Sequence, residues 1–300
     1  MKEKICFIIL HYMVLEDTIK CISSILSLKK SECVEIIVVD NCSPNGSGVE
    51  LKNRFRDFKQ VTVLLNERNE GFSRGNNLGC TYAIEKFKPD YLVVVNNDVE
   101  IVQKNFIELI QKEYQASGFD VLAVDIYNPL LKIHQNPLGK ECPDIPTVDR
   151  TIKWNSILLK RYKLLYPIIR FYFYYTQKRR KNTDYQEYQK GIVPMGACLI
   201  FSREMYINKK KIFEPETRFY YEENILALWC KYNEKTIIYT PEISVLHYEG
   251  KATKATGRNE RVRLKKRMEN ILESAKIYRE ELVKGEKDAG SEICLSAPWR

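Results

Sequence analysis

Short, continuous runs of apolar residues rich in β-branched side chains constrain the fold of this chain more than any other feature. They occupy residues 5–10, 35–40, 61–65 and 91–96. Continuous rather than alternating apolar sequence predicts strands that are buried on both faces, as in a parallel sheet. Segments with helical periodicity separate the runs, at residues 15–26, 49–58 and 76–87. This alternation predicts an α/β fold with a mostly parallel, doubly wound, Rossmann-like sheet.

The composition narrows the class of protein. Apolar residues make up 44% and charged residues 29% of 300 residues, which is typical of a globular protein with one domain and an appendage. The net charge of +9 suits phosphate-bearing ligands, nucleic acid or an anionic membrane equally. Nine cysteines without a C-x-x-C pair favour a reducing cytoplasm. Neither a signal peptide nor a membrane-spanning helix is expected.

Parallel sheets of this kind bind ligands beyond the carboxyl ends of their strands. The residues that follow the predicted strands are polar: His11, then Asp40 and Asn41, then residues 66–75, then Asn97 and Asp98. A carboxylate at the end of a buried strand can hold Mg²⁺ or Mn²⁺, so Asp98 is a candidate metal ligand, although Asp also caps turns and helices. Asp40 suits a nucleobase or ribose, or an Asx turn.

Residues 69–77 form a segment with two glycines and one arginine. Gly71 and Gly75 permit close backbone approach, and Arg74 is suited to phosphate recognition. The segment is not G-x-G-x-x-G, and the chain contains no P-loop pattern, which argues against a dinucleotide oxidoreductase or an NTPase.

Two later positions are candidates for chemistry. Glu222 and Glu223 are adjacent acids in an aromatic setting, where partial burial beside a like charge would raise one pKa toward that of a general base. They could equally form a charged turn before a helix. His247 ends an apolar stretch and could bind the metal or phosphate, or be structural.

Residues 151–190 are interpreted as an insert. Residues 164–177 are apolar and aromatic apart from Arg170, and basic clusters lie on both sides. Three interpretations are open: a membrane-binding helix pair, a nucleic-acid surface, or a lid over the active site. The bunched aromatic residues favour a membrane or a lid over nucleic acid.

The order of these pieces resembles the family 2 glycosyltransferases of the GT-A fold, particularly the bacterial rhamnosyltransferase-like members that build surface polysaccharides. Residues 36–43 resemble the family's nucleotide-binding strand end, and residues 69–79 resemble its N-x-G-F-x-x-G-N-N-x-G segment. Residues 92–99 resemble its metal-binding strand, with Asn96-Asn97-Asp98 in place of D-x-D. Residues 195–200 with Arg203 resemble its acceptor-side strand, and residues 220–223 its Y-Y-E-D segment.

The resemblance implies an inverting transfer of a sugar, rhamnose or a related hexose, from a dTDP- or UDP-linked donor. The acceptor would be a hydroxyl group of a growing surface polysaccharide or lipid-linked glycan, reached in the cytoplasm or at the inner face of the cell membrane. Glu223 would be the base, with Glu222 as the alternative, and Asp98 and His247 would hold Mg²⁺ or Mn²⁺. Expected donor-binding residues are His11, Asp40, Asn41, Asn69, Gly71, Arg74, Asn76, Asn97 and Asp98.

The expected domain arrangement follows from the same resemblance. Residues 1–257 would form the GT-A domain, with a nucleotide-sugar half at 1–100 and an acceptor half at 101–257, followed by an amphipathic helix at 258–284 and a loose tail at 285–300. Two positions depart from the family pattern, because Glu223 replaces Asp and Ile225 replaces a second acid. The alternative function is a noncatalytic membrane- or glycan-binding protein on the same fold.

Overall fold

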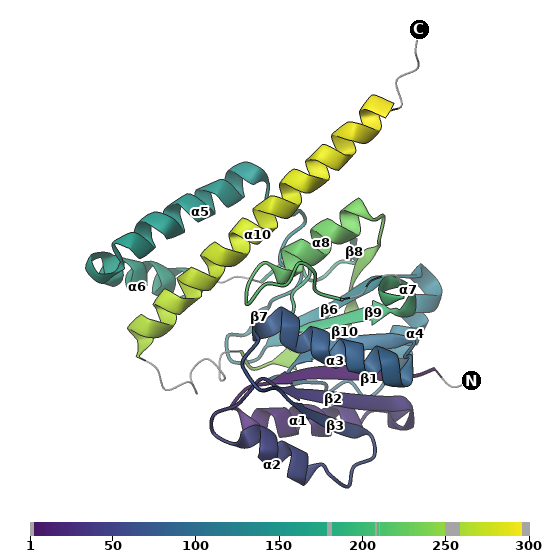
Figure 1. Ribbon diagram of the computed structural model, residues 1–300. Helices are drawn as coiled ribbons and strands as arrows, with labels where there is room; N and C mark the ends of the chain where they lie inside the picture. The colour runs from purple at the N-terminus through teal and green to yellow at the C-terminus, as the bar shows by residue number, and fades with distance from the viewer. Residues whose placement is uncertain (1–2, 179–181, 208, 210, 250–258, 296–300) are drawn as a thin grey trace.

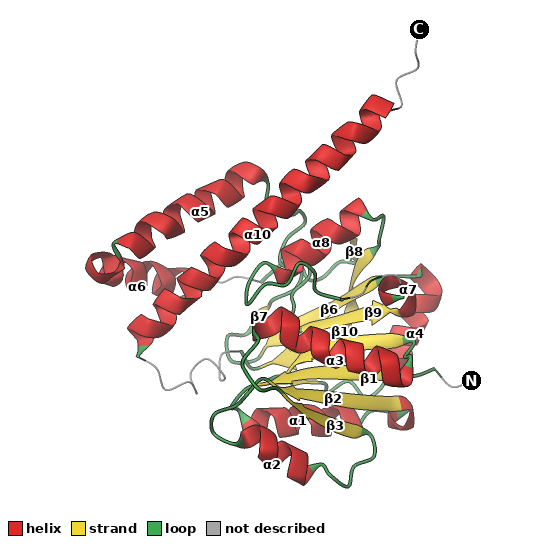
Figure 2. Cartoon of the chain, in the orientation of Figure 1, coloured by secondary structure: helices red, strands yellow, loops and turns green. Residues whose placement is uncertain are grey.

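The computed structural model describes residues 3–178, 182–207, 209, 211–249 and 259–295. Within these ranges the chain builds one mixed, mostly parallel sheet with helices on both faces (Figures 1 and 2). Its strands are β1 Ile5–His11, β2 Val34–Asp40, β3 Val61–Leu65, β4 Tyr91–Asn96, β5 Val99–Glu100, β6 Val121–Asn128, β7 Ile133–His134, β8 Gln189–Lys190, β9 Cys198–Ser202 and β10 Ile237–His247.

The helices alternate with the strands through the first half of the chain and then dominate. They are α1 Leu15–Leu26, α2 Ser47–Arg54, α3 Gly71–Phe87, α4 Phe106–Ser117, α5 Ile145–Lys160, α6 Tyr162–Lys178, α7 Arg203–Tyr206, α8 Glu222–Tyr232 and α10 Glu260–Leu295, with a short 3-10 turn at Ser31–Cys33. The predicted α/β class is therefore confirmed.

The strand order is β3-β2-β1-β4-β9-β6-β10-β5, and the first four of these are parallel neighbours. β9 is antiparallel to both of its neighbours, which makes the sheet mixed. In β1, Phe7 and Ile9 pack into the cluster beneath α1 and α4, whereas Cys6 and Ile8 pack toward α3 and α8. Burial on both faces explains the continuous apolar runs in the sequence.

Several predicted boundaries are wrong. α3 begins at Gly71 rather than at residue 76, so the glycine segment forms its first turns instead of an open loop. The insert is a helical hairpin, α5 and α6, that begins before residue 151 and ends before residue 190. α10 continues to Leu295, so residues 285–295 are helical rather than a loose tail.

α10 crosses the second half of the fold and packs on α5, α6 and α8. Tyr278 and Ala275 are fully buried against α5 and α8. Tyr278 also donates a hydrogen bond to the carbonyl oxygen of Pro143, at 2.8 Å. The long helix thus connects the α5–α6 hairpin to the body of the protein. Among the helices that the structure describes, none is both long enough and apolar enough to cross a bilayer.

Candidate functional site

The carboxyl ends of the parallel strands bring the predicted donor-binding residues to one edge of the sheet. His11 lies opposite Asp40 in the β1–β2 register, and Leu10 lies opposite Asn96 in the β1–β4 register. Asn97 and Asp98 follow directly. Open α/β sheets bind their ligands at this edge, and donor binding by these residues stays a prediction.

His11 and Asp40 are held by internal hydrogen bonds. The His11 ring is fully buried, with Nδ1 2.7 Å from Thr18 Oγ1 and Nε2 2.8 Å from Ser47 Oγ. Burial lowers the pKa of His11 to about 4, so the ring is neutral at pH 7. Asp40 accepts hydrogen bonds from the backbone N–H and the hydroxyl group of Ser43, which is the Asx turn considered above. His11 therefore positions the strand ends, and a donor contact by Asp40 remains a prediction.

Asn41 and Asn69 fix the segment that leads into α3. Asn41 donates to the carbonyl oxygen of Gly71 at 3.0 Å and accepts from the backbone N–H of Glu70 at 2.9 Å. Asn69 accepts from the backbone N–H of Gly71. Gly71 has φ +82°, and a Cβ there would lie 2.5 Å from the carbonyl oxygen of Arg218. A glycine is required because α3 begins in contact with residues 217–218.

Arg74 and Asn76 also have partners within the protein. The Arg74 guanidinium pairs with Glu216 at 2.8 Å and with Glu70 at 3.3 Å, and it remains more than half exposed. Asn76 is buried and donates to the carbonyl oxygen of Phe72 in its own helix. A phosphate contact by Arg74 is therefore still a prediction, whereas Asn76 lies inside the fold.

Asp98 and His247 are brought together by strand pairing. β5 begins directly after Asp98 and pairs antiparallel with the end of β10, so that Val99 lies opposite His247. His247 Nε2 consequently lies 3.3 Å from Asp98 Oδ1, and both side chains are almost completely buried. A cavity of about 120 Å³ opens beside them, lined by Asp17, Lys20, Asp98, Val99, Glu100 and Tyr248.

Gln135 determines which nitrogen of His247 carries a proton. Its amide nitrogen donates to Glu249 at 2.9 Å, so its amide oxygen faces His247 Nδ1, also at 2.9 Å. A carboxylate accepts only, which fixes the orientation of the amide and requires a proton on Nδ1. Nε2 then faces the Asp98 carboxylate, and a proton or a cation between these two atoms satisfies both of them.

These residues fit a divalent cation. Carboxylate and neutral imidazole are ordinary metal ligands, and a second hydrogen bond from the other ring nitrogen is the usual way of orienting such a histidine. Within the described residues, no three His, Cys, Asp or Glu side chains gather into a metal-binding group. Mg²⁺ and Mn²⁺ commonly take only one or two protein ligands and complete their coordination with phosphate and water.

The second candidate pair begins α8. Glu222 and Glu223 follow Tyr220 and Tyr221, which have φ values of +73° and +67°. Left-handed backbone costs about 1–3 kcal/mol at a residue other than glycine, and it persists where neighbouring structure enforces it. Here α10 holds the segment, since Ser274 donates to the carbonyl oxygen of Phe219 and Tyr278 packs on the Tyr221 ring.

The two glutamates have different surroundings. Burial, together with the charge of Glu223, raises the pKa of Glu222 to about 8, and Thr217 donates to it at 3.2 Å. Burial also raises the pKa of Glu223, but the backbone N–H of Gly196 donates to its carboxylate at 3.2 Å and stabilises the charged form. The proton of the pair therefore favours Glu222, and the charge favours Glu223, which has the backbone hydrogen bond.

Gly196 connects Glu223 to the strand end that carries Asp98. A Cβ on Gly196 would lie 2.6 Å from Glu223 Oε1, so only glycine lets the carboxylate approach this backbone. The next residue, Ala197, accepts a hydrogen bond from the backbone N–H of Asn96 at 2.9 Å. Met195 donates to Asn136, the neighbour of Gln135 in the chain. Backbone contacts thus bring the acidic pair and the Asp98–His247 pair into one region.

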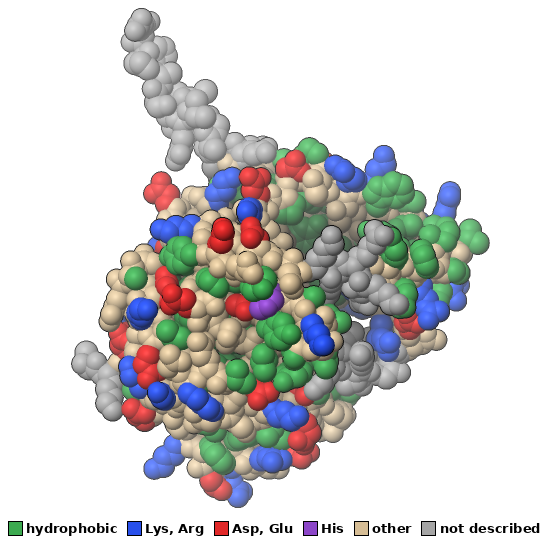
Figure 3. Space-filling view, turned by 180° about the vertical axis from the view of Figure 1, so that it is seen from behind, with side chains coloured by type: hydrophobic (Ala, Val, Ile, Leu, Met, Phe, Trp, Pro, Cys, Tyr) green, Lys and Arg blue, Asp and Glu red, His purple; other side chains and the backbone are tan. Residues whose placement is uncertain are grey.

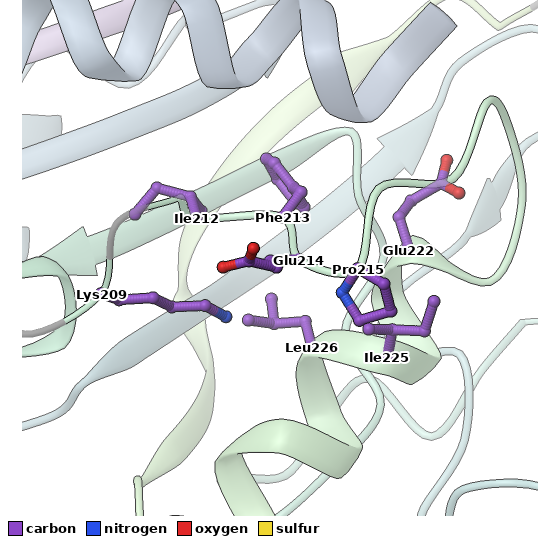
Figure 4. A pocket seen from close by; sticks show the side chains of 8 residues that line it. All are labelled: Lys209, Ile212, Phe213, Glu214, Pro215, Glu222, Ile225 and Leu226. Carbon is purple, nitrogen blue, oxygen red and sulfur yellow. The ribbon is translucent and has the colours of Figure 1, made fainter. Parts of the chain in front are cut away.

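A separate small void lies under Glu222 (Figure 4). Its walls are Ile212, Phe213, Pro215, Ile225 and Leu226, with Lys209 and Glu214 at one end. It has no room for a water molecule, so it is a packing gap and not a donor site. The Lys209 ammonium lies 3.9 Å from the centre of the Trp229 ring, and burial lowers its pKa to about 8.

Comparison with known proteins identifies the family. The model of "Glycosyl transferase family 2" matches residues 6–208. The chain belongs to the family 2 glycosyltransferases. It is 29% identical over 128 residues to glycosyltransferase GlyG of Streptococcus pneumoniae, a match that covers 43% of this chain and 40% of that protein. It is 27% identical over 128 residues to the low-salt glycan biosynthesis hexosyltransferase Agl10 of Haloferax volcanii, covering 43% of this chain and 38% of that protein. The matches span about two fifths of the length of these curated relatives.

Solved structures of S. aureus TarS share the fold. TarS 1-349 in complex with UDP superposes with a TM-score of 0.52 at 13% identity, covering 81% of this chain and 60% of that one. Its complex with UDP-GlcNAc gives a TM-score of 0.50 at 15% identity, covering 85% and 61%. The GT-A architecture predicted from the sequence is confirmed by these neighbours. The rhamnosyltransferase-like subgroup is not shown by any of them.

Sequence reasoning missed Gln135, Gly196 as a contact of Glu223, and Thr217. Gln135 lies in a loop without a recognisable motif, and only the fold brings it to His247 from 112 positions away. The sequence places Gly196 in a predicted strand, but its closeness to Glu223 depends on the start of α8. The sequence signal that could have led to the contacts of the two glutamates is the Tyr220-Tyr221 pair, because the family resemblance includes this segment.

Proposed function

We propose that this chain transfers a hexose, rhamnose or a related sugar, from a UDP- or dTDP-linked donor to an acceptor hydroxyl group with inversion of configuration. The acceptor is a growing surface polysaccharide or a lipid-linked glycan. Family membership supports sugar transfer, and similarity to the hexosyltransferase Agl10 supports the class of sugar. The UDP and UDP-GlcNAc complexes of TarS support a nucleotide-linked donor.

The observation that carries the proposal is the contact between Asp98 and His247, with the tautomer of His247 fixed by Gln135. These two side chains would hold Mg²⁺ or Mn²⁺, which supplies positive charge to the departing nucleoside diphosphate. Glu223 removes the proton of the acceptor hydroxyl group, because it is the charged member of the acidic pair. Glu222 keeps its proton and stays neutral beside it.

The remaining strand-end residues would position the donor. Asp40 lies almost buried at the end of β2, where its carboxylate can accept hydrogen bonds from a nucleobase or ribose. Asn97 donates to Thr18 at 3.0 Å, and Thr18 also contacts His11. These hydrogen bonds hold β1, α1 and the residue before Asp98 in fixed positions, which presents a preorganised edge to the donor.

The test is turnover of a panel of UDP- and dTDP-sugars by purified protein, with Mn²⁺ and then with a chelator. Release of nucleoside diphosphate from one donor, lost with the chelator, is expected. Asp98→Ala should reduce turnover by at least a factor of about 100 while the thermal unfolding temperature stays near that of the wild type. Near-normal turnover by Asp98→Ala would exclude the metal role.

A second pair of variants tests the base. Glu223→Gln should be nearly inactive, because the amide cannot accept the hydroxyl proton, whereas Glu222→Gln should keep most of the turnover. The opposite result would assign the base to Glu222. Equal activity of both variants would place the base elsewhere.

A further inference from the structure

The α5–α6 hairpin has one face in the protein and one face in solvent. On the inner side, Tyr162 and Ile169 are buried against Leu264 and Met268 of α10. The opposite side of α6 exposes a row of large side chains at helical spacing, here named the outer face of α6. Its members are Leu164, Ile168, Phe171, Tyr172 and Tyr175.

This exposure is unusual for a folded protein. Leu164 is 78% exposed, and Ile168 and Phe171 are each 67% exposed. Contiguous apolar surface of this kind marks an interaction site more often than single exposed residues do. A helix that packs with one side and presents leucine, isoleucine and phenylalanine on the other is incompletely buried by its own chain.

The charge around the outer face is of one sign. Residues 150–178 contain seven Lys or Arg and no Asp or Glu, although the whole chain has 48 basic and 39 acidic residues. Lys160, Arg161 and Lys163 are all exposed where α5 turns into α6. Arg170 pairs with Glu260 of α10, which places an acidic residue on the inner side rather than on the outer face.

Apolar side chains bordered by cations match the surface of an anionic bilayer. Leucine, isoleucine and phenylalanine enter the boundary between headgroups and acyl chains, tyrosine rings suit the same depth, and lysine and arginine contact lipid phosphates. A nucleic acid would use the cations and the aromatic rings but would have no use for Leu164 and Ile168. A bound helix would lie along the surface, consistent with the failure of every described helix to meet the length and hydropathy of a span.

We propose that the outer face of α6 docks this protein on an anionic lipid surface. In Figure 1 the hairpin lies on the side toward which the carboxyl ends of the parallel strands point. Seen from behind, hydrophobic and basic side chains gather together at the projecting end of the molecule (Figure 3). Docking through this face turns the strand-end site toward the membrane, where the sugar of a lipid-linked acceptor lies; this last step rests on the proposed function.

The experiment is cosedimentation of the purified chain with phosphatidylcholine vesicles that contain about one third phosphatidylglycerol, compared with pure phosphatidylcholine. Wild-type protein is expected to bind the anionic vesicles, with affinity that falls as salt is raised. Leu164→Ser/Ile168→Ser should weaken binding by a factor of about 10–100, because two apolar side chains no longer enter the bilayer. Lys160→Gln/Lys163→Gln should weaken it by about tenfold.

The matched control is Leu130→Ser/Leu131→Ser, which removes two exposed leucines from a loop that follows β6. This pair should bind vesicles like the wild type. All variants should unfold at the wild-type temperature. With a soluble acceptor, all should release nucleoside diphosphate from the sugar donor at the wild-type rate, so failure of docking is distinguishable from failure of the proposed transfer.

Three results would overturn the proposal. These are no binding of wild-type protein to anionic vesicles, equal loss in the two serine pairs, and self-association through the outer face. Light scattering detects the last of these as a dimer that Leu164→Ser/Ile168→Ser converts to a monomer. In the first of these cases, binding to a single-stranded oligonucleotide that Leu164→Ser/Ile168→Ser abolishes would identify a nucleic acid as the partner instead of a membrane.

Discussion

Glu222→Gln should stabilise the protein, and the gain should depend on pH. Glu222 is buried beside Glu223, and its pKa is raised from 4.5 to about 8. A carboxyl group whose pKa is raised by folding favours the folded state fully below its unfolded pKa and loses that advantage as pH rises to the folded pKa. The stability difference between Glu222→Gln and the wild type therefore develops between pH 4.5 and about 8.

The magnitude follows from the shift. At pH 7 the unfolded carboxyl group is ionised and the folded one is protonated, which costs about 1.4 kcal/mol per pH unit above 4.5, or roughly 3 kcal/mol in the free energy of unfolding. Glutamine is neutral in both states and can still accept the hydrogen bond from Thr217. For a chain of this size, a gain of that order raises the unfolding temperature by roughly 5–10 °C.

Thermal unfolding of wild type and Glu222→Gln at pH 5 and pH 7.5 measures the effect. The variant should be close to wild type at pH 5 and clearly more stable at pH 7.5. Glu50→Gln, at an exposed position on α2, is the matched control and should show no pH-dependent difference. Equal shifts at both pH values, or a less stable Glu222→Gln, would refute the reasoning that Glu222 is protonated in the folded protein.

Three further predictions test other contacts. Gly196→Ala should reduce turnover by about tenfold or more, since the new methyl group displaces the flexible Glu223 carboxylate; the unfolding temperature should change little, and unchanged turnover would contradict this role. Gln135→Leu should weaken Mn²⁺ binding by about 10–100-fold in calorimetry, because His247 loses the partner that orients it, whereas Gln111→Leu, on α4, should not. Lys209→Met should raise the free energy of unfolding by roughly 3 kcal/mol at pH 7, and this gain should disappear as pH rises from 8 to 10.5. A gain that persists at pH 10.5 in thermal unfolding would show that burial does not lower the Lys209 pKa.

The sheet and the polar residues at the carboxyl ends of its strands could be predicted because their signals are local. Each parallel strand is buried on both faces, so its run of apolar residues and the polar residue that ends it are adjacent in the sequence. Asp40 and Asp98 are recognisable in this way. The sequence marked the glycine segment but did not show that α3 begins within it. Gly71, with its positive φ, is compatible with both a loop and a helix start.

The internal partners of the predicted site residues could not be inferred from sequence. His11 looks like a strand-end ligand until Thr18 and Ser47 are seen to occupy both ring nitrogens. Arg74 looks like a phosphate contact until Glu216, 142 positions away, is seen beside it. The first partnership depends on how α1 and α2 pack on β1, and the second on how α3 packs on the segment before α8. No periodicity or motif encodes that packing.

The length of the C-terminal helix was underestimated for a related reason. Helical periodicity marks the residues that pack, such as Met268 and Tyr278, and ends where packing ends, whereas the backbone continues to Leu295. The packed part bears on the site. It buries Tyr278 against Tyr221 and binds Phe219 through Ser274, and these contacts enforce the left-handed backbone that starts α8.

Two backbone features bring the chemistry together from distant parts of the chain. The short β5 strand pairs with the end of β10 and places His247 beside Asp98, and the turn at Gly196 is bonded both to Glu223 and, through Ala197, to Asn96. The first feature is a main-chain pairing, and in the second the backbone N–H of Gly196 donates to the side-chain carboxylate of Glu223. The acid after Glu222 can therefore be Glu instead of Asp, since the Gly196 N–H fixes where its carboxylate lies. The departure from the family pattern at residue 223 is thus compatible with a working base.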